Sequence, residues 1–158
     1  ESLGTQSGTM PISLIQSVND RPDEVARTLL ATTFGYGLMR YRDGTTIIPD
    51  FMVNAVNIVR NFGYGDPGVA VYPGWHPDNP LLLSGIEAKA TVLVKEKESL
   101  VMLGSFGPEG TLTIDLSGLQ FKEPVVCNAE SGAMIASGQQ IQLPLPRYDY
   151  RLLLIREK

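Results

Sequence analysis

The sequence predicts an α+β fold, with a short N-terminal β/α segment whose two helices pack on a C-terminal antiparallel β-sandwich. Up to Phe62 the apolar residues recur at helical spacing, whereas from Ile86 onward they alternate with polar residues or form short runs between turns. A segment rich in Pro and Gly, residues 63–80, separates the two patterns. We therefore expect an α/β segment over residues 1–80, including this junction, and a sandwich over residues 81–158.

The first part of the chain predicts strand, helix, strand and helix in that order, over residues 10–16, 22–34, 38–41 and 49–62. Asp20 and Pro22 are typical of a helix start. The second helix has a continuous apolar stripe that includes Phe51, Val56, Val59 and Phe62, and Gly63 follows it as an expected left-handed cap. Two such units leave open sheet edges, so they look like the last part of a longer β/α repeat and could self-associate.

Seven short strands at intervals of about ten residues, with Gly or Pro between them, are typical of an antiparallel sandwich or barrel, and we expect the sandwich. They are expected over 88–95, 100–106, 111–116, 124–128, 133–136, 140–145 and 148–155. We expect one contiguous core from alternating residues: Val92, Val94, Leu103, Ile114, Val126, Ile141, Leu152 and Leu154. The last strand loses its alternation near Leu153, which predicts a central position covered on both faces.

Composition excludes several classes of function. Thirteen basic and seventeen acidic residues give a net charge of −4, which argues against a nucleic-acid partner. The single Cys and the single His argue against a disulfide and against a metal site, and no motif indicates a cofactor. No apolar run reaches the roughly 18 residues of a membrane-spanning helix. The first residues do not resemble a signal peptide, so we expect a chain cut from something longer or one whose leader has been removed.

The sequence shows no catalytic constellation. A Ser/His/Asp triad and a phosphate-binding loop both lack their motifs. Asp43 follows a predicted strand, so it is either a turn residue or part of an active-site rim. Arg147, Asp149 and Arg151 alternate, which predicts a solvated strand face. We therefore assign no catalytic residue.

The junction holds the only substrate-binding candidates, Trp75, His76 and Asp78, in a loop bounded by turn residues. Trp75 is either a hydrophobic plug between the two parts of the chain or a platform on which a sugar ring stacks. His76 is either a hydrogen-bonded loop residue or a ligand or base, and Asp78 occupies a turn position before Asn79-Pro80. Earlier in the junction, residues 69–72 read as a short extended segment.

The layout resembles the C-terminal end of bacterial glycoside-hydrolase chains. The resemblance lies in Asn61-Phe62-Gly63-Tyr64-Gly65-Asp66 at the end of the second helix, in the turn Asn128-Ala129-Glu130-Ser131-Gly132, and in the closing Tyr150-Arg151-Leu152-Leu153-Leu154-Ile155. Those chains carry a (β/α)8 barrel followed by a β-sandwich. The resemblance implies a carbohydrate partner, a location outside the cytoplasm and a non-catalytic role, because the catalytic carboxylates of such chains lie on earlier barrel strands.

Two other functions stay open from the sequence. The chain could be a freestanding sandwich module that binds carbohydrate or another protein, or a small enzyme complete in itself. The sugar, its linkage and the oligomeric state do not follow from the residues.

Overall fold

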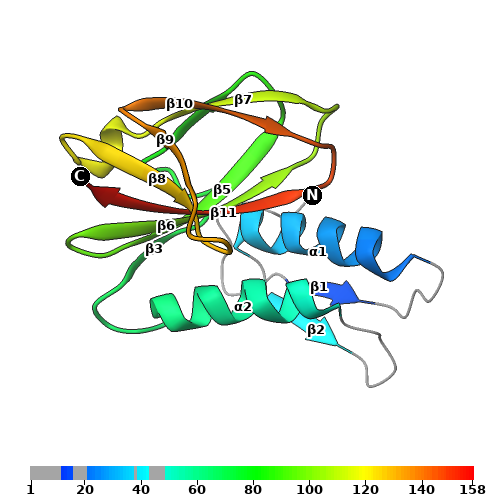
Figure 1. Cartoon of the computed structure of the whole chain (residues 1–158). Coiled ribbons are helices and arrows are strands. Elements are labelled where there is room, and N and C mark those ends of the chain that lie inside the picture. The colour runs from blue at the N-terminus through cyan, green and yellow to red at the C-terminus, as the bar shows by residue number, and fades with distance from the viewer. Residues whose placement is uncertain (1–11, 16–20, 38, 43–48) are drawn as a thin grey trace.

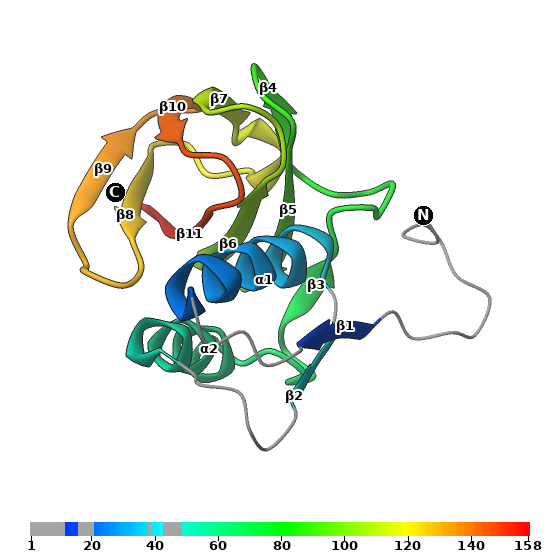
Figure 2. The ribbon, with the colours of Figure 1, turned by 90° about the vertical axis from the view of Figure 1, so that its right-hand side faces the viewer.

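The computed structural model describes residues 12–15, 21–37, 39–42 and 49–158, and it has the predicted α+β fold (Figure 1). A three-stranded sheet packs on a six-stranded sheet, and helices α1 and α2 cover the outer face of the larger sheet. A two-stranded sheet lies on the side of α1 that faces away from the sandwich (Figure 2).

The N-terminal elements follow the predicted order. Strands β1 (Ile12–Ile15) and β2 (Met39–Arg42) are parallel and in register, and α1 (Pro22–Tyr36) connects them. Helix α2 spans Asp50–Phe62. Each described helix therefore begins and ends within two residues of its predicted bounds. The roles expected of Asp20 and Asp43 lie outside the described residues.

Helix α2 ends as the sequence predicts. Gly63 has a φ of +101°, and its backbone N–H donates to the carbonyls of Val59 and Arg60. This left-handed conformation suits a residue without Cβ. The apolar stripe of α2 faces the six-stranded sheet, with Val59 and Phe62 buried and with Phe51 and Val56 partly buried.

The sandwich contains the seven predicted strands and two more. In chain order its strands are β3 (Ala70–Tyr72), β4 (Leu82–Ser84), β5 (Ala88–Val94), β6 (Glu98–Ser105), β7 (Gly110–Asp115), β8 (Pro124–Asn128), β9 (Met134–Ser137), β10 (Gln140–Leu145) and β11 (Tyr150–Glu157). Their order is β3-β5-β6-β11-β8-β9 in the larger sheet and β10-β7-β4 in the smaller, and every pair is antiparallel. The extended segment predicted at 69–72 is confirmed as β3, whereas β4 was not predicted.

The expectation of one contiguous core was wrong, because the described residues form two. An inter-sheet core lies between the two sheets, and a helix-side core lies between the six-stranded sheet and the helices. Of the expected core residues, Leu152 belongs to the helix-side core with Leu154 partly buried beside it, while Val94 is only partly buried at the edge of the inter-sheet core. The other five are buried in the inter-sheet core: Val92, Leu103, Ile114, Val126 and Ile141.

Strand β11 causes this division, since it is central and covered on both faces, as predicted. It pairs with β6 on one side and with β8 on the other. Side chains alternate across a strand. Leu153 and Ile155 therefore face the smaller sheet, whereas Tyr150 and Leu152 face the helices.

Candidate functional site

The described chain has two candidate sites: the junction loop 73–80, which holds the predicted binding candidates, and a polar network where α1 meets the sandwich. No three His, Cys, Asp or Glu side chains within the described ranges are grouped to hold a metal ion. Neither α1 nor α2 is long and apolar enough to span a membrane.

The junction loop brings two of its three candidates together. The rings of Trp75 and His76 lie 6.0 Å apart between centroids, and the His76 ring meets the ring of Tyr72 edge-on at 5.7 Å. His76 Nδ1 accepts a hydrogen bond of 3.1 Å from the backbone N–H of Asp78. The Asp78 side chain is exposed, whereas Trp75 and His76 are partly buried.

Asn79 fixes this loop, and sequence reasoning missed its role. Its Nδ2 group donates to the carbonyls of Tyr72, Pro73 and Ala90 at 3.2, 3.1 and 2.9 Å, and its Oδ1 accepts from the backbone N–H of Leu81. The side chain thereby ties the loop to β3 and β5. An Asn before Pro indicates a turn, but no pattern in the sequence reveals these partners.

A hollow of about 320 Å³ borders the loop. His76, Pro77 and Asn79 line it from the loop, and Leu82 and Lys89 line it from β4 and β5. Trp75 and Asp78 lie outside its lining. The hollow therefore combines an imidazole, an ammonium group and apolar surface, without a carboxylate in its wall.

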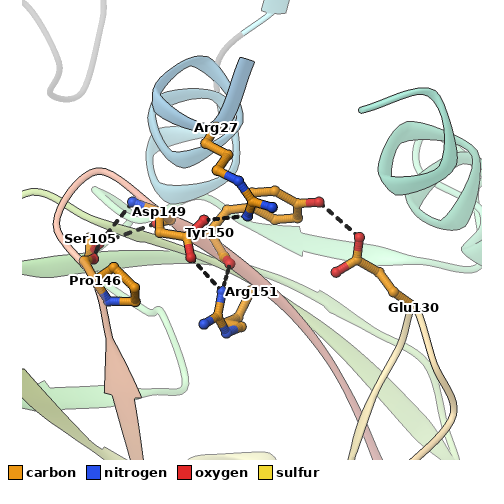
Figure 3. A network of polar contacts seen from close by, with 7 residues as sticks. All are labelled: Arg27, Ser105, Glu130, Pro146, Asp149, Tyr150 and Arg151. Carbon is orange, nitrogen blue, oxygen red and sulfur yellow. Dashed lines mark hydrogen bonds and ion pairs between the residues drawn. The ribbon is translucent and has the colours of Figure 1, made fainter. Parts of the chain in front are cut away.

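The second region is the network around Asp149 (Figure 3). Asp149 is only 6% exposed, and its two carboxylate oxygens accept hydrogen bonds from Arg27 Nη1 at 3.0 Å and Arg151 Nη1 at 2.6 Å. The prediction of a solvated face was therefore wrong for Asp149. Arg27 lies on α1, which packs over this part of the sheet and covers the carboxylate.

Ser105 holds the backbone of the same loop. Its hydroxyl donates to the carbonyl of Pro146 and accepts from the N–H of Asp149 at 3.2 Å. Its own N–H donates to the carbonyl of Asp149 at 3.0 Å. The chain between β10 and β11 is thus attached at both ends to the end of β6.

Tyr150 extends the network toward α2. Its ring lies edge-on to Phe34 at 5.6 Å and stacked on Phe51 at 6.4 Å, while its Oη donates to Glu130 Oε1 at 2.8 Å. Burial raises the pKa of Tyr150, and the hydrogen bond to Glu130 and its charge raise it further.

The charge state of Asp149 follows from opposing effects. Burial raises the pKa of Asp149, but the hydrogen bond and charge of Arg151, the backbone N–H of Tyr150 and the hydrogen bond of Arg27 together outweigh it. The pKa therefore lies below its ordinary value, and the carboxylate is ionised at neutral pH. This arrangement joins α1 to the sandwich, and it contains neither a nucleophile nor a base aimed at a cavity.

Comparisons with known proteins bear on the fold. The sequence matches no protein-family model, and no curated protein matches it. The structure is similar to a GH27 β-L-arabinopyranosidase from Geobacillus stearothermophilus (10% identity, TM-score 0.57), to α-galactosidase I from Mortierella vinacea (10%, 0.54) and to an α-amylase from Anoxybacillus (13%, 0.57).

These matches cover 85%, 92% and 94% of this chain but only 30%, 39% and 38% of the three enzymes. At these identities the likeness concerns the fold alone. The resemblance drawn from the sequence is confirmed at that level: the chain has the fold of one part of glycoside-hydrolase chains.

Proposed function

We propose that this chain is the C-terminal, non-catalytic part of a glycoside-hydrolase-like protein. Residues 1–80 would supply the end of a (β/α)8 barrel and, through β3, one edge strand of the sandwich, which residues 81–158 otherwise form. The observation that carries this proposal is the parallel pair β1–β2, which is connected through α1 while α1 also packs on the sandwich.

A parallel pair of strands requires further strands beside it. Parallel sheets are found with both faces covered, and a two-stranded sheet is marginal by itself. Both outer edges of the β1–β2 pair are free of other described strands. The pair therefore suits a place in a larger parallel sheet that other residues complete.

The position of α1 relative to the two sheets supports a barrel as the larger parallel sheet. The helices of a (β/α)8 barrel form its outer ring. Here α1 lies between the sandwich and the β1–β2 pair (Figure 1). A barrel containing β1 and β2 would then extend away from the sandwich, with α1 between them.

The helix-side core gives the sandwich its supporting role. Residues of both helices and of the six-stranded sheet share this core, including Leu30 of α1, Val59 of α2 and Leu152 of β11. In a complete barrel the catalytic carboxylates stand at the carboxyl ends of several strands. A protein containing only two such strands lacks most of that rim.

The test compares two lengths of the same protein. The 158-residue chain should hydrolyse no aryl glycoside of any common sugar, whereas the protein extended by its upstream reading frame should hydrolyse at least one. An upstream extension with barrel periodicity supports the proposal. Turnover by the 158-residue chain that disappears in Asp78→Asn contradicts it and favours a small enzyme, and a start codon directly upstream contradicts it as well.

Carbohydrate binding at the junction loop is a second candidate function, favoured by the hollow beside His76. The single Trp makes it measurable, because the emission of Trp75 then reports on this loop alone. Binding predicts that neutral oligosaccharides shift the emission and protect it from iodide. Emission that stays unchanged with oligosaccharide and is poorly quenched by iodide rejects this site and supports Trp75 as a plug.

The open strand edges have their own expected consequence. The isolated chain should self-associate through the β1–β2 edges, because unpaired strand edges are templates for pairing with another chain. Light scattering over a range of concentrations measures this. The extended protein, whose barrel would cover those edges, is the control and should stay monomeric under the same conditions.

A further inference from the structure

Tyr148 has a backbone conformation that a tyrosine rarely adopts. Its φ is +54°, in the left-handed region that disfavours a bulky side chain. It lies in the short connection between β10 and β11. Glycine and asparagine occupy such positions at lower cost, so a role in the turn alone does not explain a tyrosine here.

The surroundings of Tyr148 hold this conformation in place. Pro146 and Asp149, on either side, are both hydrogen-bonded to Ser105, and the Asp149 carboxylate is fixed by Arg27 and Arg151 (Figure 3). A residue in an unfavourable conformation persists where its neighbours determine the backbone. These contacts therefore fix the backbone on both sides of Tyr148.

The ring and its neighbour form a combined aromatic and cationic surface. Tyr148 is 42% exposed, which is high for a large aromatic residue. The Arg147 guanidinium lies 4.5 Å from the ring centroid, and its Nη2 donates to Tyr148 Oη at 2.9 Å. Arg147 forms no ion pair with any residue that the structure describes.

The arginines on and around this connection differ in their partners. Arg27 and Arg151 share one carboxylate, that of Asp149, directly beside Tyr148. Both of these arginines are therefore paired, whereas Arg147 forms no ion pair with any described residue. Glu130, the other carboxylate in Figure 3, faces the Tyr150 hydroxyl.

We propose that Arg147 and Tyr148 bind an acidic sugar. An exposed tyrosine ring offers an apolar face for a pyranose ring, and a guanidinium with free N–H donors matches a carboxylate. The ligand class is therefore a uronic-acid oligosaccharide. This site is independent of the barrel proposal and lies on a different loop from Trp75, His76 and Asp78.

Binding is tested with the 158-residue chain and a galacturonic-acid hexamer, by isothermal titration at low salt. Arg147→Gln and Tyr148→Gly should each weaken binding at least about tenfold, because a charge-assisted hydrogen bond and a stacked ring are each worth roughly that factor. Tyr148→Phe should retain most of it. Tyr64→Ser removes an equally exposed tyrosine from the turn after α2 and should leave binding unchanged.

A stability measurement separates binding from a structural role. Tyr148→Gly and Tyr148→Asn remove an unfavourable conformation, so their Tm should be equal to that of the parent or higher by up to about 4 °C. The proposal is overturned if the parent does not bind the hexamer, if a neutral hexamer of glucose binds equally well, or if the Tm of both variants falls while binding persists.

Discussion

Gly104→Ala should loosen the attachment of α1 to the sandwich. Gly104 lies on β6 where α1 crosses it, and a Cβ added there would lie 2.0 Å from the carbonyl oxygen of Ala31 and 2.7 Å from its carbonyl carbon. Both contacts are with helix backbone, which cannot rotate away as a side chain can. Bringing the shorter one to an ordinary 3.4 Å requires the helix to move by about 1.4 Å at this point.

The size of the effect follows from what α1 buries. The helix contributes five residues to the helix-side core: Ala26, Leu29, Leu30, Ala31 and Phe34. Inserting a methyl group into a packed core costs about 1–3 kcal/mol. A gap of 0.5–1 Å forfeits roughly a quarter to a half of the dispersion energy of the contacts that it opens. Together these effects predict a loss toward the upper end of about 1–3 kcal/mol in the free energy of unfolding.

Urea unfolding followed by circular dichroism measures this loss, and hydrogen exchange locates it. Exchange should accelerate along α1 and stay slow in β7 and β10, whose buried residues belong to the inter-sheet core. Gly68→Ala is the matched control, since a Cβ there meets nothing within 4 Å. If the two variants differ by less than about 0.5 kcal/mol, the close backbone contact at Gly104 does not exist in solution and the reasoning is refuted.

Three further predictions concern the same two-core structure. Leu152→Ala should lower the free energy of unfolding in urea by about 2–5 kcal/mol, because Leu152 is fully buried on the central strand. A loss below about 1 kcal/mol would mean that the Leu152 side chain is not buried in the core. Gly63→Ala should cost about 1 kcal/mol, because φ is +101° and the added Cβ would lie 2.7 Å from Asp66 Oδ2; a gain in stability would contradict the left-handed cap. Asp149→Asn should cost about 1–3 kcal/mol at pH 7. The folded pKa of Asp149 lies below its unfolded value of 3.8, so its stabilisation is complete above that pH and is lost as the pH falls through the folded pKa. The difference between Asp149→Asn and the parent should therefore shrink below about pH 4, and a difference that stays constant under strongly acidic conditions would contradict the ion-pair network.

The sequence predicts those elements whose signal is local. The apolar stripe of α2, the glycine after it and the period-two alternation in β7 and β10 each report a single element and the face that it buries. The type and the approximate bounds of each such element therefore follow from its own residues, without knowledge of its neighbours in space.

The remaining features depend on partners distant in the chain. Nothing local to Asp149 indicates that Arg27, 122 positions earlier, covers it. Its alternation with Arg147 and Arg151 therefore predicts a solvated face instead. Leu152 and Leu154 have the right spacing for a core but face the helices, because period two does not say which of two layers each face meets. Asn79 likewise looks like an ordinary turn residue.

The position of β11 has a consequence for how the protein folds during synthesis. It comes after all the other described strands in chain order, yet it separates β6 from β8 in the middle of the larger sheet. Until residues 150–157 leave the ribosome, the β3-β5-β6 part and the β8-β9 part share no hydrogen-bonded strand, and each core lacks its central residues. The nascent sandwich should therefore remain open to chaperones and proteases until this strand emerges, and translation products that stop before residue 150 should be degraded rather than accumulate as partly folded chains.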